Sequence, residues 1–89
     1  MALPQFSIPT DMLDIEGQTL TLRGLTRGEI IKLKNFEDEI EGEIWTLATG
    51  LELPLDEVRA WYDKAPTMIV QKIVKKIVEL SGLDDLGNA

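Results

Sequence analysis

The 89-residue chain contains no cysteine and no histidine. The first absence excludes disulfides, thiol nucleophiles and thiolate metal sites. The second removes the commonest general base and the commonest metal ligand. Cations are scarce as well, with 9 Lys and Arg residues against 16 Asp and Glu residues and a formal net charge of −7. Direct binding of nucleic acid or anionic lipid is therefore disfavoured, because both need a surplus of cations.

Long hydrophobic runs are also missing. No apolar stretch approaches the roughly 20 residues that span a bilayer, and the opening residues MALPQF lack the basic and apolar regions of a signal peptide. Neither a dinucleotide-binding nor a Walker-type glycine motif occurs. We therefore expect a cytoplasmic, non-enzymatic protein without cofactor, metal or membrane contact.

The residues that are present predict one small globular domain, since 44% are apolar and 28% are charged. Pro4 and Pro9 favour an extended arm over residues 1–12. The domain itself is expected over residues 13–83, and residues 84–89 are expected to form a flexible polar tail.

A β-hairpin is predicted at the start of this domain. Leu13 and Ile15 alternate with polar residues, as do Leu20 and Leu22, and Gly17 supplies the turn between the two runs. An isolated two-stranded hairpin is marginal in water. We therefore expect its leucine face to lie on the helices that follow.

The clearest local signal is a capping box at Thr26 and Glu29, which starts a helix at residue 27. The apolar residues after it keep one helical phase for several turns, which favours a single helix over 27–49. Gly42 is placed on its wet face, where a kink is the alternative to a straight helix. Gly50 is the expected left-handed terminator.

Two further helices are predicted, over 54–63 and 66–81, each opened by a proline. Ser81, Gly82 and Leu83 match a Schellman stop, with Gly82 in the left-handed conformation. The expected fold is mainly α, with a short N-terminal β-hairpin packed on a three-helix array.

The last helix carries the first candidate protein interface. Its apolar residues cover nearly half of the helix circumference, more than one core face needs. Either the other elements bury this surplus, or an apolar strip stays open for a partner or for self-association. The candidate residues are Ile69, Val70, Ile73, Val74 and Ile77.

A second candidate interface is acidic. It could dock a basic partner or mimic nucleic-acid charge, although short acidic runs are more often solvated helix faces. Its residues are Glu37, Asp38, Glu39, Glu41 and Glu43. Trp45, Trp61 and Tyr62 are expected in the core, with an interface hot spot as the alternative for one of them.

Several segments together resemble the tail assembly chaperones of long-tailed, siphovirus-type bacteriophages. The likeness runs from TLTLRGLTRGEI at 19–30, through WTLATG at 45–50 and DEVRAWY at 56–62, to the Ala65-Pro66 break and ELSGL at 79–83. It spans about residues 20 to 83 and contains no catalytic motif.

The resemblance implies a small, largely helical, non-enzymatic protein that acts during virion morphogenesis. Such chaperones coat the aggregation-prone tape measure protein and recruit tail tube protein subunits in the host bacterial cytoplasm. They are absent from the mature virion and often have a longer form made by ribosomal frameshifting. The resemblance transfers no binding residue to this chain.

Two alternatives from other functional classes remain open at this stage. An acidic inhibitor that mimics nucleic acid would need carboxylates spaced like phosphates over an exposed face. A small regulatory adaptor would need only an exposed protein-binding surface. A homo-oligomer is compatible with each of these functions.

Overall fold

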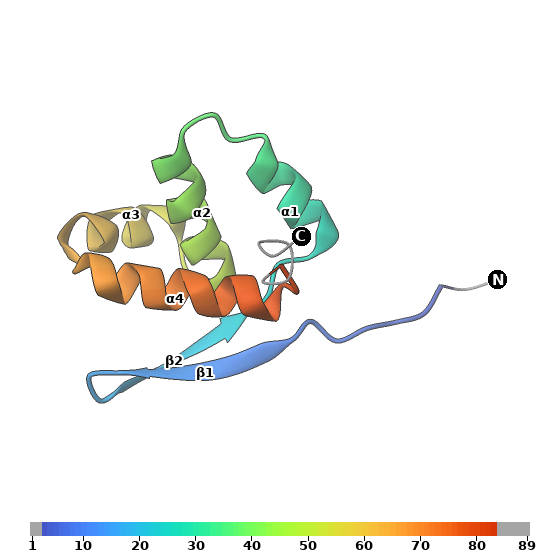
Figure 1. The fold of residues 1–89 in the computed structure, drawn as a ribbon, viewed down its shortest axis with the longest axis horizontal. Coiled ribbons are helices and arrows are strands. Elements are labelled where there is room, and N and C mark those ends of the chain that lie inside the picture. The colour runs from blue at the N-terminus through green and yellow to red at the C-terminus, as the bar shows by residue number, and fades with distance from the viewer. Residues whose placement is uncertain (1–2, 84–89) are drawn as a thin grey trace.

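The computed structural model describes residues 3–83 and contains a two-stranded hairpin followed by four helices (Figure 1). The elements are β1 (Thr10–Ile15), β2 (Gln18–Arg23), α1 (Arg27–Lys34), α2 (Glu39–Leu51), α3 (Leu55–Lys64) and α4 (Thr67–Leu80). Helices thus predominate behind an N-terminal hairpin, as expected. The predicted number of helices is wrong, because the expected helix over 27–49 is two helices.

The hairpin turn is the one that the sequence predicts. Ile15 pairs with Gln18, and the two residues between them have positive φ, 50° at Glu16 and 85° at Gly17. A two-residue turn with positive φ at both positions matches the right-handed twist of the strands. The first strand begins at Thr10 instead of Leu13, so the extended N-terminal segment is shorter than the predicted 1–12 arm.

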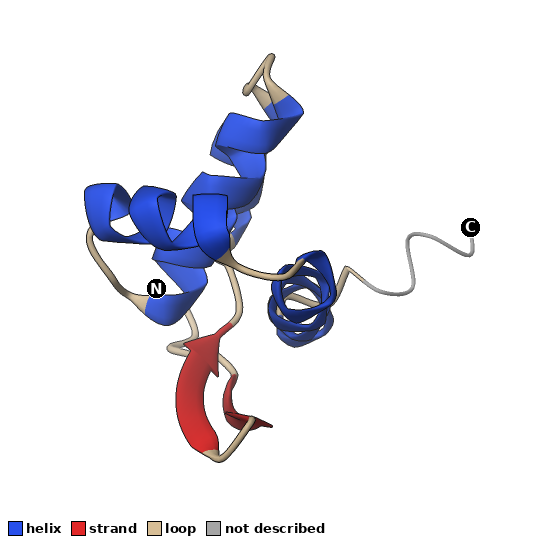
Figure 2. Cartoon of the chain, turned by 90° about the vertical axis from the view of Figure 1, so that its left-hand side faces the viewer, coloured by secondary structure: helices blue, strands red, loops and turns tan. Residues whose placement is uncertain are grey.

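The hairpin runs below α4 in Figure 1 and contacts both α4 and α2, which lies behind α4 in that view (Figures 1 and 2). Leu22 is fully buried, and Leu20 is half-buried with Leu13 and Ile15. Asp11 accepts a hydrogen bond from Lys76 of α4 at 2.9 Å. The predicted packing of the leucine face on the helices is confirmed.

The chain leaves the helix between Lys34 and Glu39. Asn35 ends α1, and the carboxylate of Asp38 then accepts hydrogen bonds from the Ile40 amide at 2.9 Å and the Glu41 amide at 3.4 Å. A side-chain acceptor for the first free amides is what starts a new helix.

The break between α1 and α2 allows tertiary contacts that a continuous helix could not make. In a continuous helix, residues nine apart would lie about 13 Å apart along the axis. The break instead brings the rings of Phe36 and Trp45 to 5.7 Å. It also places Gly42 against Leu33, where an added Cβ would lie 3.4 Å from Leu33 Cδ1. Gly42 is therefore buried between α1 and α2, and its predicted place on the wet face is wrong.

The end of α2 also differs from expectation. The helix runs through Gly50 to Leu51, and the left-handed residue is Glu52, with φ 56°. Gly50 is buried against Ile77 of α4, where an added Cβ would lie 2.7 Å from Ile77 Cγ1. This glycine is a contact point between two helices and not a terminator.

The last two helices agree closely with the prediction. Pro54 and Pro66 are the N-caps of α3 and α4. At the end of α4, Gly82 has φ 77°, its amide donates to Glu79 O at 3.0 Å, and the Leu83 amide donates to Val78 O at 3.1 Å. These two bonds are the Schellman pair. The expected tail over residues 84–89 lies outside the described residues.

The predicted capping box joins the hairpin to the helices. The Glu29 carboxylate accepts from the Thr26 amide at 2.9 Å, and Thr26 Oγ1 accepts from the Glu29 amide at 3.2 Å. Arg23, at the end of β2, donates two further hydrogen bonds to the same carboxylate, each at 2.8 Å. The guanidinium of Arg23, with help from Thr26, lowers the pKa of Glu29 to about 2.

The low pKa of Glu29 predicts that this carboxylate contributes to the unfolding free energy in a way that depends on acid pH. A carboxylate with a depressed folded-state pKa contributes fully above its unfolded pKa, and that contribution is lost as the pH falls. For Glu29 the loss should run from about pH 4.5 towards about pH 2. We expect Glu29→Gln to flatten the decline of the unfolding free energy over this range, measured by urea titration. Glu37→Gln, at an exposed carboxylate, is the control, and equal slopes for the two variants would contradict the prediction.

Candidate functional site

The apolar interface predicted on the last helix is mostly core. Ile73 and Ile77 are 0% exposed and Val70 is buried, while Ile69 and Val74 are half-buried. The hairpin and α2 cover the stripe, and Val58 of α3 belongs to the same core cluster. The wide apolar face of α4 is therefore mostly buried within the domain. Val70, Ile73 and Ile77 are not available to a partner.

The predicted acidic face is divided by the break between α1 and α2. Asp38 caps α2, and Glu37 and Glu39 are exposed. Glu41 accepts two hydrogen bonds from Arg59 of α3, one of them at 2.7 Å.

Glu43 is engaged in the same way. It accepts a hydrogen bond from the Tyr62 hydroxyl at 2.9 Å. Hydrogen bonding by Arg59 lowers the pKa of Glu41, and the bond to Glu43 raises the pKa of Tyr62. Glu41 and Glu43 thus connect α2 to α3, and the five carboxylates do not form one free surface.

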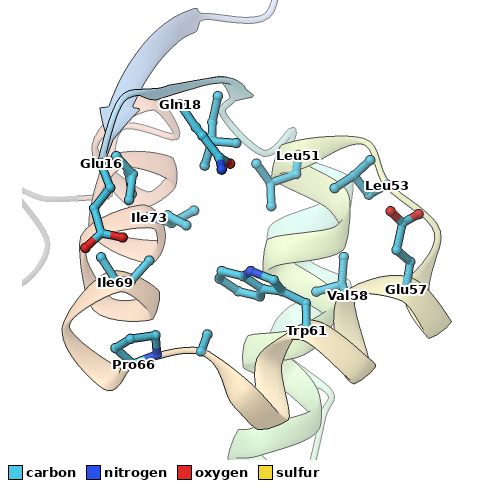
Figure 3. Close-up of a pocket in the computed structure, with 13 residues that line it drawn as sticks. Glu16, Gln18, Leu51, Leu53, Glu57, Val58, Trp61, Pro66, Ile69 and Ile73 are labelled. Carbon is cyan, nitrogen blue, oxygen red and sulfur yellow. The ribbon is translucent and has the colours of Figure 1, made fainter.

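The candidate site is a groove that the sequence analysis did not identify. It has a volume of about 350 Å³ and lies between the hairpin tip, the end of α2, α3 and the start of α4 (Figure 3). We call it the Trp61 groove. Its residues are Ile15, Glu16, Gln18, Leu20, Leu51, Leu53, Glu57, Val58, Trp61, Ala65, Pro66, Ile69 and Ile73.

Trp61 is the central feature of this groove. Its indole points from α3 across the groove towards α4 (Figure 3). Trp61 is 38% exposed, although tryptophan residues are highly buried on average. The neighbouring Tyr62 turns towards α2 and binds Glu43. The two aromatic residues thus have different roles, and of the two only Tyr62 links α3 to α2 by a hydrogen bond.

The groove combines an apolar floor with acidic sides. Glu16 of the hairpin turn and Glu57 of α3 lie on opposite sides of it (Figure 3). No lysine or arginine is among its lining residues. Such a surface can accept apolar side chains and attracts cations at its edges. Its lining residues include no serine, threonine, tyrosine or lysine, and its two carboxylates lie on opposite sides.

Sequence reasoning missed the groove because its lining residues come from the hairpin tip, the end of α2, α3 and the start of α4, which lie far apart in the sequence. The available signal was Trp61 beside Tyr62 on a short helix, where both aromatic rings cannot face one core.

Among residues 3–83, no group of three acidic side chains could hold a metal ion, and no helix is long and apolar enough to cross a membrane. Comparisons with protein families, with curated proteins and with solved structures found no match.

Proposed function

We propose that this protein is a non-enzymatic tail assembly chaperone of a long-tailed bacteriophage, and that it holds client segments in the Trp61 groove. Its clients are the tape measure protein and, through it, the tail tube protein. It acts in the host bacterial cytoplasm and is left out of the mature virion. The partners and the location come from the sequence resemblance over residues 20 to 83.

The half-exposed Trp61 is the observation that supports a protein-binding role. Tryptophan is enriched among the residues that dominate binding energy at protein interfaces. Here its indole is presented in a hollow with Leu53 and Ile69 rather than on a flat surface. An apolar side chain of a client helix would lose its water-exposed surface in this hollow, which is the main source of affinity in such sites.

The net charge of the chain fits the same role. A charge of −7 makes copies of the chaperone repel one another over most of their surfaces, which opposes aggregation through exposed apolar side chains. By contrast, a nucleic-acid mimic would need free and evenly spaced carboxylates. Glu41 and Glu43 are already engaged by Arg59 and Tyr62, which weakens that alternative.

The proposal is tested by co-expressing the chain with the tape measure protein of the same phage. We expect the chain to keep the tape measure protein in the soluble fraction and to co-purify with it. Trp61→Ala should abolish most of this effect, because it removes the floor of the groove. Leu55→Ala is the matched control on the same helix, at a comparably exposed apolar position outside the groove.

Circular dichroism must first show that both variants are folded. Equal protection by Trp61→Ala and the parent would exclude the groove as the client site. Failure of the parent chain itself to bind the tape measure protein would overturn the chaperone function. In that case binding to another protein through the groove would favour a regulatory adaptor.

A further inference from the structure

The segment over residues 3–9, which we call the arm, exposes large apolar side chains without using them in the fold. Leu3 is 82% exposed and Phe6 is 85% exposed, and Ile8 is exposed as well. The arm contains no charged residue. It runs away from the rest of the molecule in an extended conformation (Figure 1). Such a segment gains free energy when a surface covers it.

The direction of the arm is set where it joins the hairpin. The Gly24 amide donates a hydrogen bond to Pro9 O at 2.9 Å, which extends the pairing of the two strands beyond Thr10 and Arg23. Pro9 also restricts the residue before it to extended conformations. The arm therefore leaves the molecule at the end opposite the hairpin turn (Figure 1).

This direction keeps Phe6 of the arm away from the Trp61 groove of its own chain. Phe6 lies three residues before Pro9, a reach of at most about 11 Å. The strand from Pro9 to Ile15 covers about 20 Å in the other direction. Even if the arm doubled back along β1, Phe6 would stop well short of the groove wall at Ile15 and Glu16.

The groove and the arm are nevertheless complementary. The groove holds about 350 Å³ and is floored by apolar side chains, which suits one phenyl ring and an adjoining aliphatic side chain. Two copies that each carry a net charge of −7 repel one another over most of their surfaces. The uncharged arm can approach Glu16 and Glu57 without adding to this repulsion.

We propose that the arm of one copy occupies the Trp61 groove of a second copy, with Phe6 as its anchor. The inference concerns the chain by itself and does not depend on the identity of any client. Arm and groove lie at opposite ends of the molecule, so the contact is head-to-tail. Such contacts produce closed rings or open chains rather than twofold dimers. A client segment entering the groove would displace the arm.

The test is the mass of the purified chain, measured by sedimentation equilibrium over a range of concentrations. We expect the mass to rise above the 10.0 kDa of one copy, and to do so at high salt as well, because apolar contacts are not screened. Phe6→Ser should weaken association by at least about tenfold, as expected for the loss of one buried phenyl ring. Met12→Ser, at another exposed apolar position, should leave it unchanged.

Mixing two variants gives the decisive result. Trp61→Ala keeps its arm but has a damaged groove, and Phe6→Ser keeps its groove but has a damaged arm. At a concentration where the parent just associates, each variant should be a monomer by itself. An equal mixture should form a heterodimer and stop there, because one intact arm meets one intact groove. Leu53→Ser, at an exposed position of the groove wall, replaces Trp61→Ala if that variant does not fold.

Three outcomes would overturn the inference. The first is a parent chain that is monomeric at every concentration, and the second is a Phe6→Ser variant that associates like the parent. The third is a mixture of the two variants that stays monomeric. A monomeric parent that still binds the tape measure protein would remove the arm exchange and leave the proposed chaperone function intact.

Discussion

Replacing Ile73 with glutamate should abolish the folded state. Ile73 is 0% exposed and lies where α4 meets the other elements of the core. A carboxylate there would be buried without a cation beside it, at a cost of several kcal/mol. That cost is comparable to the entire stability of a small domain, roughly 5 kcal/mol at the low end. Circular dichroism should show the loss of a cooperative thermal transition.

Met68→Glu is the matched control for this substitution. Met68 belongs to the same helix and is 81% exposed, so a charge at this position stays in water. We expect its melting midpoint to equal that of the parent. A cooperative transition for Ile73→Glu near the parent midpoint would show that α4 is not packed as described.

This result also governs how association experiments are interpreted. A loss of binding in variants of Ile73 or Ile77 would report unfolding and not the loss of an interface. Trp61 and Phe6 are the informative positions, because both are exposed in the single chain.

Gly24→Ala is the second substitution with a large expected effect. Gly24 follows β2 and lies directly against the end of α4. A Cβ on this residue would lie 2.6 Å from the carbonyl carbon of Leu80 and 2.9 Å from the Ser81 amide nitrogen, and closer still to the Leu80 carbonyl oxygen. These are backbone atoms of a helix end, which cannot rotate away as a side chain does.

Two hydrogen bonds hold this close approach in place. The Leu25 amide donates to Ser81 Oγ at 2.8 Å, and Ser81 Oγ donates to Ile77 O at 2.6 Å. One methyl group would therefore have to separate the hairpin from α4 or break this link. We expect Gly24→Ala to lower the unfolding free energy by about 3 kcal/mol, the upper end of the usual cost of overpacking.

Urea titration of Gly24→Ala and Gly28→Ala tests this expectation. At Gly28 an added Cβ meets nothing closer than Thr26 Oγ1, at 4.0 Å, and the residue lies in α1. Alanine there should be neutral or raise stability by up to about 1 kcal/mol, because it favours the helix. A Gly24→Ala variant as stable as the parent would contradict the packing of the hairpin on α4.

The sequence by itself determined the features whose partners lie a few residues apart. The turn at Glu16 and Gly17, the capping box of Thr26 and Glu29, and the stop at Gly82 are all found as predicted. Each depends on backbone conformations and hydrogen bonds within about six residues. Such interactions form in the same way in many folds, so a local pattern is enough to identify them.

Tertiary structure alone decided where the long helix is interrupted and what its glycines do. The apolar phase continues across residues 35–38, so periodicity could not show the break. The contact between Phe36 and Trp45 and the capping by Asp38 make the interrupted chain the better packed one. Gly50 resembles a helix terminator in sequence, yet it lies inside α2, where Ile77 occupies the space that a side chain would need.

The candidate site shows the same limit most clearly. Residues 16, 57 and 61 come together only because the hairpin tip, α3 and α4 converge around one hollow. The amphipathic pattern of α4 predicts that its apolar face is covered, but it does not show which elements cover that face. Which side chains remain half-exposed after folding is decided by how those elements fit together, and a sequence pattern carries no information about that fit.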